Sequence, residues 1–304
     1  MHGVRPLGRA NMTRMAVVLI LAACPWARAA SPSPAKPEDT PANTAEGAGW
    51  VLAWSDEFEN PGAPDPAKWS FFTGMTKPQC PVVFTRRPEN VRVENGRLIL
   101  EARLETFRNP GYRPGSTRPR EQLETVPYTS GRVETRGRFE WQYGRMEVRI
   151  KPSAARGTNA AIWTMGKNYT QVNWPRCGEI DVLEYLGRTP DVLWHVMHFA
   201  NDQGGHASQS QNAPAPFTDG EFHTLAVEWD EQEVRWFVDG QPTWSFPLDS
   251  AGVPDGNPYR QPHFLILSLS VGGWGGDPDP RDYPTRTEIE YVRVYSRAPA
   301  PATP

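Results

Sequence analysis

Short runs of alternating apolar and polar residues recur along most of this chain and end at turn-forming residues. The run TEIEYVRVYS (287–296) alternates strictly, and Asn95-Gly96 and Asp239-Gly240 each separate two further runs. A period of two places apolar side chains on one face of a β-strand, and these dipeptides favour two-residue hairpin turns. No segment carries a sustained helical period with capping residues. The chain is therefore predicted to be all-β, and we expect an antiparallel jelly-roll sandwich.

The first 30 residues have the features of an export signal. Three arginines precede the apolar run MAVVLILAA (15–23), which is too short to span a bilayer as a stable anchor. The small residues of ARAA (27–30) predict cleavage near residue 29, whereas LAAC (21–24) resembles a bacterial lipobox, with cleavage near residue 24 and lipidation of Cys24. Both interpretations predict export, and we favour a secreted or periplasmic protein over a lipoprotein anchored to the membrane through Cys24.

The folded part is expected to be one domain, residues 50–296. Residues 31–49 are rich in proline and alanine without an apolar period, as in a linker, and residues 297–304 resemble them and predict a disordered tail. Cys80 and Cys177 lie within the domain. An oxidising compartment would allow a disulfide between them, but the pattern equally suits two buried thiols, and both alternatives stay open.

Composition excludes one class of partner and suggests another. The formal net charge of -3 argues against binding to the phosphate backbone of nucleic acids. The 12 tryptophans exceed what a core of this size usually needs. They indicate either additional core aromatics or stacking surfaces for a ligand.

The segment CGEIDVLEYLG (177–187) places three carboxylates in an apolar run. On a regular strand Glu179 and Asp181 share a face, whereas Glu184 falls on the opposite face. A one-residue β-bulge after Asp181, within Val182-Leu183, returns Glu184 to the face of the other two acids. Bulges are frequent beside active sites, so the spacing predicts a bulged strand with all three acids on its outer face.

Two carboxylates on one concave face have the chemistry to cleave a glycosidic bond. One attacks the anomeric carbon and the other protonates the leaving oxygen, and retaining enzymes hold the two groups about 5–5.5 Å apart. A third carboxylate between them raises at least one pKa, so that one acid keeps its proton near neutral pH. A solvated acidic strand and a calcium site are the alternatives that the spacing leaves open.

The same segment resembles the E-x-D-x-x-E signature of glycoside hydrolase family 16, in the bulged form typical of laminarinase-type β-1,3-glucanases. Lichenase-type members and xyloglucan transglycosylases usually have the unbulged E-x-D-x-E. Further segments resemble the family in the expected order: WSDEF, YTSGRVETRGRFEWQYGRMEVRIK, AAIWTMG, FHTLAVEWDEQEVRWFVDG and YVRVY. The resemblance covers nearly all of residues 50–296 and implies a jelly-roll sandwich with a concave substrate cleft.

The resemblance implies a retaining endo-glycosidase that hydrolyses β-1,3-glucan such as laminarin. Glu179 would be the nucleophile, Glu184 the acid/base, and Asp181 would orient the nucleophile through a hydrogen bond. Catalysis needs no organic cofactor, and we expect a monomer that acts on polysaccharide. Mixed-linkage β-1,3-1,4-glucan, a galactan and transglycosylation are alternatives. A non-catalytic glucan-binding protein is less favoured, because such proteins typically lose the two glutamates that this chain retains.

The resemblance also assigns residues that would bind sugar, since pyranose faces stack on aromatic rings and hydroxyls bind polar side chains. The matching positions are Asn90, Arg132, Trp163, Trp174 and His198. Trp274, in a glycine-rich loop after a strand, is a further substrate-binding candidate at the cleft rim. Trp163 could instead belong to the core, Arg132 could be a surface cation, and His198 could have a structural role. His195, three residues before His198, falls on the other face of a regular strand.

The family often carries a structural Ca²⁺ on its convex side. The matching ligands are Glu57, the backbone of Gly96 and Glu290, and calcium prefers such oxygen ligands. The family more often has aspartate where Glu290 stands, so this chain departs from the pattern there.

The chain departs from the laminarinase pattern at three places, and two of these changes are expected to touch the substrate cleft. Asn159-Ala160 stands where Trp-Pro is usual, Ser268 stands where asparagine is common, and QCPVVFT (79–85) lacks the usual N-E-x-Q. The long polar segment 105–127 is expected to shape the subsites on the non-reducing side. These changes leave the hydrolytic acids intact and weaken the assignment to laminarin.

Overall fold

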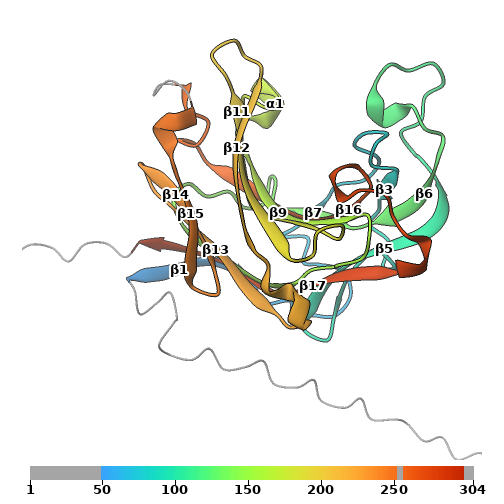
Figure 1. Ribbon diagram of the computed structural model, residues 1–304, viewed down its shortest axis with the longest axis horizontal. Helices are drawn as coiled ribbons and strands as arrows, with labels where there is room; N and C mark the ends of the chain where they lie inside the picture. Colours follow the sequence, from blue (N-terminus) through green and yellow to red (C-terminus); the bar gives the residue numbers. More distant parts are fainter. Residues whose placement is uncertain (1–48, 252–255, 298–304) are drawn as a thin grey trace, which may run out of the picture. The chain divides into compact units, whose positions relative to one another are not determined.

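Two β-sheets pack face to face in the computed structural model, which describes residues 49–251 and 256–297 (Figure 1). All of the described residues belong to one compact unit of the chain. The predicted signal peptide with Cys24, residues 31–48 of the predicted linker and residues 298–304 of the predicted tail lie outside the described residues. No helix within the described ranges is long and apolar enough to cross a membrane.

The larger sheet has ten strands, and its main path runs β15-β14-β13-β8-β17-β5-β6-β3, with β1 paired to β17 and β4 paired to β5. These strands are β1 (Trp50–Asp56), β3 (Val82–Phe84), β4 (Val91–Glu94), β5 (Arg97–Arg108), β6 (Thr125–Ser130), β8 (Gly144–Lys151), β13 (His223–Trp229), β14 (Glu233–Val238), β15 (Gln241–Pro247) and β17 (Thr285–Arg297). Their pairs are antiparallel except β3 with β6.

The smaller sheet has seven strands in the order β12-β11-β10-β9-β16-β7-β2. They are β2 (Ser70–Phe71), β7 (Arg132–Glu134), β9 (Thr158–Gly166), β10 (Glu179–Leu186), β11 (Val192–Ala200), β12 (His206–Pro214) and β16 (His263–Val271). The described helices are short: α1 (Tyr169–Val172), η3 (Pro119–Glu121), η4 (Pro216–Asp219), η5 (Leu248–Ala251), η7 (Gly273–Gly275) and η8 (Pro280–Asp282). The predicted all-β antiparallel sandwich is confirmed.

Two predicted hairpin turns have the backbone that their residues favour. Asn95 and Gly96 have φ of 54° and 72° and connect β4 to β5, and Asp239 and Gly240 have φ of 48° and 76° and connect β14 to β15. A type I′ turn requires positive φ at both central positions, which asparagine, aspartate and glycine tolerate best. These dipeptides therefore fix the registers of the two hairpins.

Apolar side chains of the two sheets fill the space between them. Leu98 and Leu100 of the larger sheet and Ile162 and Leu267 of the smaller sheet are fully buried in one cluster. The tryptophans divide between the two roles that composition suggested: Trp50, Trp69, Trp141, Trp229 and Trp236 are buried, whereas Trp163, Trp174 and Trp274 line a cleft.

The C-terminal boundary of the domain extends one residue beyond the prediction. Arg297, which we assigned to the tail, ends β17 and pairs with Trp50 of β1. Its guanidinium lies 3.9 Å from the centre of the Trp50 ring. This stacking and the strand pairing explain why Arg297 is ordered with the sheet.

Candidate active site

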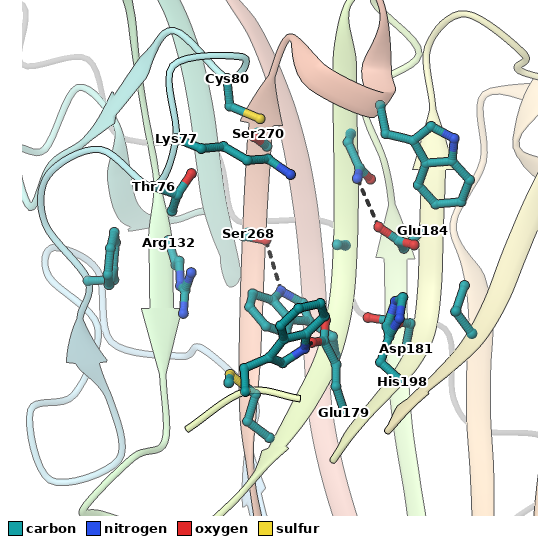
Figure 2. Close-up of a pocket in the computed structure, with 18 of the residues that line it drawn as sticks. Thr76, Lys77, Cys80, Arg132, Glu179, Asp181, Glu184, His198, Ser268 and Ser270 are labelled. Carbon is teal, nitrogen blue, oxygen red and sulfur yellow. Dashed lines mark hydrogen bonds and ion pairs between the residues drawn. The ribbon is translucent and has the colours of Figure 1, made fainter. Parts of the chain in front are cut away.

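The face of the smaller sheet that points away from the core lines a cleft of about 890 Å³ (Figure 2). The cleft contains all three predicted catalytic acids, which alternate with buried apolar residues along β10. It also contains most of the predicted sugar-binding residues, namely Arg132, Trp163, Trp174, His198 and Trp274. Segments that are far apart in the sequence thus supply one continuous surface.

The predicted β-bulge is present in β10. Against β11, Asp181 pairs with Val196 and Glu184 pairs with Trp194, so the intervening Val182 and Leu183 lie opposite a single residue. Both intervening residues are fully buried. Glu184 therefore lies on the cleft face together with Glu179 and Asp181, as the spacing of the three acids in the sequence predicts.

His195 holds this bulge from the core side of β11. Its Nδ1 lies 2.8 Å from Val182 O and its Nε2 lies 2.9 Å from Thr243 Oγ1. Because a carbonyl can only accept, Nδ1 carries the proton and Nε2 accepts one from the hydroxyl. Burial lowers the pKa of His195 to about 4, so the ring is neutral. Beside the bulge, Trp236 of β14 donates a 3.0 Å hydrogen bond from Nε1 to Asp181 O of β10.

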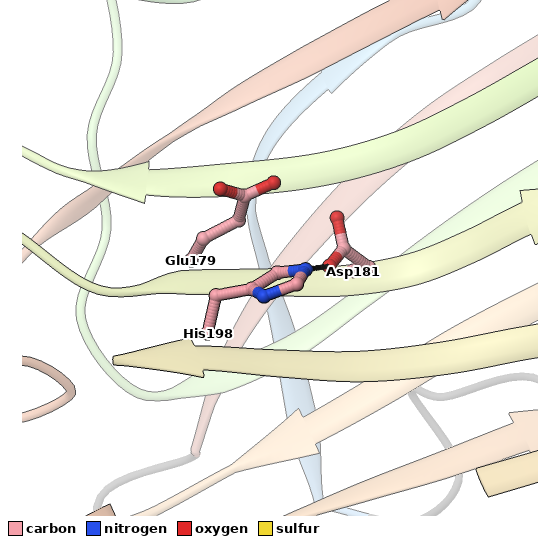
Figure 3. A group of neighbouring side chains, drawn as sticks. All are labelled: Glu179, Asp181 and His198. Atoms are coloured by element: carbon pink, nitrogen blue, oxygen red, sulfur yellow. Dashed lines mark ion pairs between the residues drawn. The ribbon is translucent and has the colours of Figure 1, made fainter. Parts of the chain in front are cut away.

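Glu179 and Asp181 form a compact group with one histidine of β11 (Figure 3). His198 Nε2 lies 3.3 Å from Asp181 Oδ2, and one ligand-type atom from each of the three residues lies within 4.8 Å of the others. Trp174 Nε1 donates a 2.6 Å hydrogen bond to Glu179 Oε2. His198 Nδ1 also lies 2.8 Å from His206 Nε2 of β12. The two acids are therefore fixed by an indole and by a pair of imidazoles.

Glu184 has a different set of neighbours. Asn159 of β9 donates a 3.0 Å hydrogen bond from Nδ2 to Glu184 Oε1. Lys77 reaches into the cleft from the opposite wall, and its charge lowers the pKa of Glu184 (Figure 2). Glu184 thus receives one hydrogen bond and faces one cation.

Burial and mutual repulsion raise the pKa of all three acids. The pKa of Glu179 is raised to about 8, mainly by loss of solvation and secondly by the charge of Asp181. Loss of solvation raises the pKa of Glu184 to about 7, against the opposing hydrogen bond from Asn159. The pKa of Asp181 is raised well above its ordinary value, mainly by loss of solvation and secondly by the charge of Glu184. The cleft therefore holds protons on carboxyl groups at neutral pH.

Aromatic and cationic side chains order the wall formed by β7, β9 and β16. Trp163 Nε1 donates a 3.0 Å hydrogen bond to Ser268 Oγ. The Arg132 guanidinium lies 4.7 Å from the Trp163 ring centre and 4.3 Å from that of Phe72, and it is 2.7 Å from a Glu134 oxygen. Arg132 is therefore a packed cation of the cleft wall, and Trp163 presents part of its ring to the cleft.

Two tryptophans stand exposed at the cleft rim. Trp174 is 42% exposed and its ring centre lies 4.6 Å from that of His206. Trp274, in the short helix η7, is 39% exposed and lies 5.7 Å from Trp194. Rings that remain open to solvent while one edge is fixed are suited to stack on a sugar.

The prediction that Asn90 contacts sugar is wrong. Asn90 is 0% exposed and does not line the cleft. Its Nδ2 donates to Glu101 O and Thr129 Oγ1, and its Oδ1 accepts from Thr85 Oγ1. Asn90 instead ties β5 and β6 to the preceding loop, a role that is consistent with full burial of a polar side chain.

The side chains predicted to bind calcium are engaged by arginines. Glu57 forms a two-point ion pair with Arg293, at 2.9 and 3.1 Å. Glu290 accepts from Arg149 at 2.8 Å and from Arg97 at 3.4 Å. Guanidinium groups thus supply the positive charge that a cation would bring, so these residues do not fit the predicted calcium site that also included Gly96.

The remaining metal-ligating and thiol groups are accounted for by other contacts. Among the described residues, the one group of at least three acid, histidine or cysteine side chains close enough to share an ion is Glu179, Asp181 and His198. His198 already lies 3.3 Å from Asp181, and Glu179 already accepts a hydrogen bond from Trp174. Cys80 and Cys177 are separate buried thiols, so the alternative of a disulfide between them does not hold.

Sequence reasoning missed three residues beside the acids. The sequence marks Asn159 only as a departure from the family pattern, and our predictions include no role for His206 or Lys77. The alternation of β12 carried a signal for His206, because His206 and Ser208 share the face that meets β11 at the cleft. Lys77 lies in a loop, where no periodicity predicts direction. The predicted loop 105–127 contributes Arg120 to the cleft wall.

Comparisons with known proteins agree with this architecture. Beta-glucanase of Rhodothermus marinus is 38% identical over 261 residues, covering 81% of this chain and 85% of that protein. The X-ray structure of the laminarinase from Rhodothermus marinus is 37% identical with a TM-score of 0.69, covering 81% of this chain and 97% of that chain. Two other relatives are longer, and the chain spans 34% and 38% of their lengths.

A third similarity is to a structure from work on endo-acting O-glycanases with which human gut bacteria initiate mucin breakdown. It is 35% identical with a TM-score of 0.76, covering 82% of this chain and 91% of that chain. The sequence pattern of "Glycosyl hydrolases family 16" matches residues 82–293, which include the bulged strand and most of the cleft lining. This chain belongs to glycosyl hydrolase family 16.

Proposed function

We propose that this chain is an endo-acting glucanase that hydrolyses β-1,3-glucan with net retention of configuration. The observation that carries the proposal is the bulge at Val182, which brings Glu179 and Glu184 to one face with Asp181 between them. A retaining glycosidase needs such a pair on one side of the scissile bond. The names of the Rhodothermus relatives, a beta-glucanase and a laminarinase, support β-1,3-glucan as the substrate.

In the first step Glu179 attacks the anomeric carbon as a carboxylate. The bond between that carbon and the glycosidic oxygen breaks, and the proton of Glu184 passes to the leaving oxygen, which departs as a hydroxyl. The raised pKa of Glu184, about 7, leaves part of this group protonated at neutral pH, as a proton donor requires. In the second step water attacks the glycosyl ester, its proton returns to Glu184, and Glu179 leaves as a carboxylate.

Asp181 makes the ionised form of Glu179 accessible. The charge of Asp181 is the second-largest cause of the raised pKa of Glu179, after burial. Asp181 is the most deeply buried of the three acids, and burial raises its pKa well above the ordinary value, which favours its uncharged form and weakens that repulsion. Trp174, which donates to Glu179 Oε2, stabilises the remaining negative charge.

A product profile with matched variants tests this function. Laminarin and curdlan should be cleaved to oligosaccharides, and proton NMR of the first product should show the β-anomer. Glu179→Gln and Glu184→Gln should each reduce kcat on laminarin by more than about a hundredfold while glucan binding persists. An initial α-anomer, or near-normal turnover by Glu179→Gln, contradicts the assignment. Transfer to an added acceptor sugar in place of water would indicate a transglycosylase.

A second candidate is an endo-acting glycosidase for mucin O-glycans. Two observations favour it: the similarity to the O-glycanase structure reaches a TM-score of 0.76, and Asn159 stands where the laminarinase pattern has tryptophan. Mucin O-glycans, lichenan and agarose therefore belong beside laminarin in the same assay. Cleavage of the O-glycan with no action on laminarin would transfer the proposal to this substrate and keep the same catalytic residues.

We also infer export from the N-terminal segment, either by simple secretion or as a lipoprotein through Cys24. Mass spectrometry of the mature protein separates these routes, because cleavage near residue 29 removes Cys24. We further expect a monomer, which light scattering on the purified protein tests.

A further inference from the structure

Asn159 lies beside the proposed acid/base and touches only one of its two oxygens. It sits on the cleft face of β9 and donates from Nδ2 to Glu184 Oε1 at 3.0 Å. The other end of its amide, Oδ1, is buried and has no hydrogen-bond partner among the described residues. A buried amide with an unpaired oxygen costs stability. This cost indicates that Asn159 is placed for its contact with Glu184.

The contact distinguishes the two oxygens of the carboxyl group. An N–H donor binds an unprotonated oxygen better than a protonated one, because the lone pairs of the unprotonated oxygen carry more negative charge. With Nδ2 on Oε1, the proton of Glu184 is therefore favoured on Oε2. The Glu184 side chain reaches into the cleft from β10, so Oε2 is the oxygen left to meet the substrate (Figure 2).

We propose that Asn159 is a positioning residue that directs the transferable proton of Glu184 to Oε2, the oxygen free to face the glycosidic bond. The proposal rests on the double displacement described above. In its first step the Oε2–H bond breaks, the proton forms an O–H bond on the leaving oxygen, and Glu184 becomes a carboxylate. Nδ2 then remains bound to Oε1, so Oε2 is again the oxygen that removes a proton from water in the second step.

The other charged groups around Glu184 do not distinguish its Oε1 from its Oε2. Glu179 and His198 act on Glu184 through their charges, as does Lys77 from the opposite wall, and Glu184 in turn acts on Asp181. Asn159 is the residue whose described hydrogen bond selects one oxygen of Glu184. Its effect is therefore expected on proton transfer to the leaving group rather than on sugar binding.

Substitutions at Asn159 and substrates of different leaving-group ability test the proposal. Asn159→Leu keeps the approximate size without a donor, and Asn159→Ala removes the side chain. Both should reduce kcat on laminarin, or on whichever glycan proves to be the substrate, about tenfold to a hundredfold with little change in KM, less than the full effect of a general acid. Activity on the matching dinitrophenyl glycoside should change by less than about threefold in glycosylation rate, because its leaving group departs without protonation.

The pH profile supplies a readout that a general loss of folding does not produce. The hydrogen bond from Asn159 lowers the pKa of Glu184, so its loss should move the alkaline limb of kcat/KM to higher pH. Asn159→Asp, isosteric but negatively charged, should move this limb further in the same direction. Glu184→Ala is the reference for complete loss of the acid, and it should show the same dependence on the leaving group in a stronger form.

Opposite outcomes overturn the proposal. Equal losses on the polysaccharide and on the dinitrophenyl substrate, with an unchanged alkaline limb, would assign Asn159 a structural role. A carbon-13 NMR titration of glutamate-labelled protein gives the pKa of Glu184 without any substrate. A pKa that rises in Asn159→Leu supports the hydrogen bond even if the glycan assignment fails, and a pKa that stays unchanged contradicts it.

Discussion

The indole of Trp174 donates a 2.6 Å hydrogen bond to Glu179 Oε2 and leaves part of its ring exposed at the cleft rim. One side chain thus serves two purposes that substitution can separate. The Nε1–H stabilises the ionised carboxylate, whereas the ring is available to a sugar.

Trp174→Phe should impair the nucleophile more than it impairs substrate binding. Phenylalanine retains an aromatic face but has no donor, so the pKa of Glu179 should rise further above about 8. Because Glu179 must be ionised to attack, the acidic limb of the kcat/KM profile should move to higher pH. Trp274→Phe, at the other rim position, is the control: it should change KM and leave that limb in place. Identical shifts in both variants would contradict the role of the Trp174 donor.

Glu179→Gln should stabilise the fold, and the gain should increase with pH. A carboxyl group whose pKa is higher in the folded chain binds protons more tightly there than in the unfolded chain. Its contribution to the free energy of unfolding therefore falls as pH rises from about 4.5 to about 8. Glutamine removes this loss, so the Tm difference from the parent chain should be larger at pH 8 than at pH 5. Glu89→Gln, at an exposed position, serves as the control. An equal gain in Tm at both pH values would argue against a raised pKa of Glu179 in the folded chain.

His195→Leu should destabilise the chain through the bulge. Leucine leaves Val182 O buried without its donor, a loss of about 1–3 kcal/mol in the free energy of unfolding. Thr243→Val removes only the partner of the other ring nitrogen, so its effect should be smaller. Urea denaturation measures both. The idea that His195 holds the bulge is wrong if the two variants lose the same stability and the same activity.

Chelation should leave thermal stability unchanged, because arginines neutralise the carboxylates that were expected to bind calcium. The Tm in EDTA should match the Tm in added calcium within the error of the measurement. Arg149→Met, by contrast, should lower the Tm, since Glu290 is buried and loses its nearer cation. A Tm that rises with calcium would restore the metal site.

The sequence predicted the features that follow from periodicity. Alternation identified the strands, positive-φ dipeptides identified two hairpins, and the phase of Glu184 relative to Glu179 required a bulge. Burial along the strands agrees with these predictions, because the alternation of apolar residues in the sequence indicates which face of a strand packs in the core.

Contacts between distant segments were not predictable in the same way. Asn90 matched a sugar-binding position but lies among hydrogen-bonding partners from β5 and β6, and a polar residue carries no sequence mark of burial. The arginine that pairs with Glu57 is 236 residues away along the chain. Such pairs depend on strand order, which alternation leaves undetermined.

The bulge makes β10 one residue longer than the stretch of β9 that it pairs with. This surplus length is absorbed locally, since Asp181 pairs with Trp163 and pairing resumes with Leu183 opposite Ile162. The floor of the cleft consequently consists of two registers that meet at Val182, one carrying Glu179 and the other carrying Glu184. The bulge therefore sets the separation of the nucleophile and the proton donor along β10, because Glu179 pairs with Met165 in one register and Glu184 pairs with Ala161 in the other.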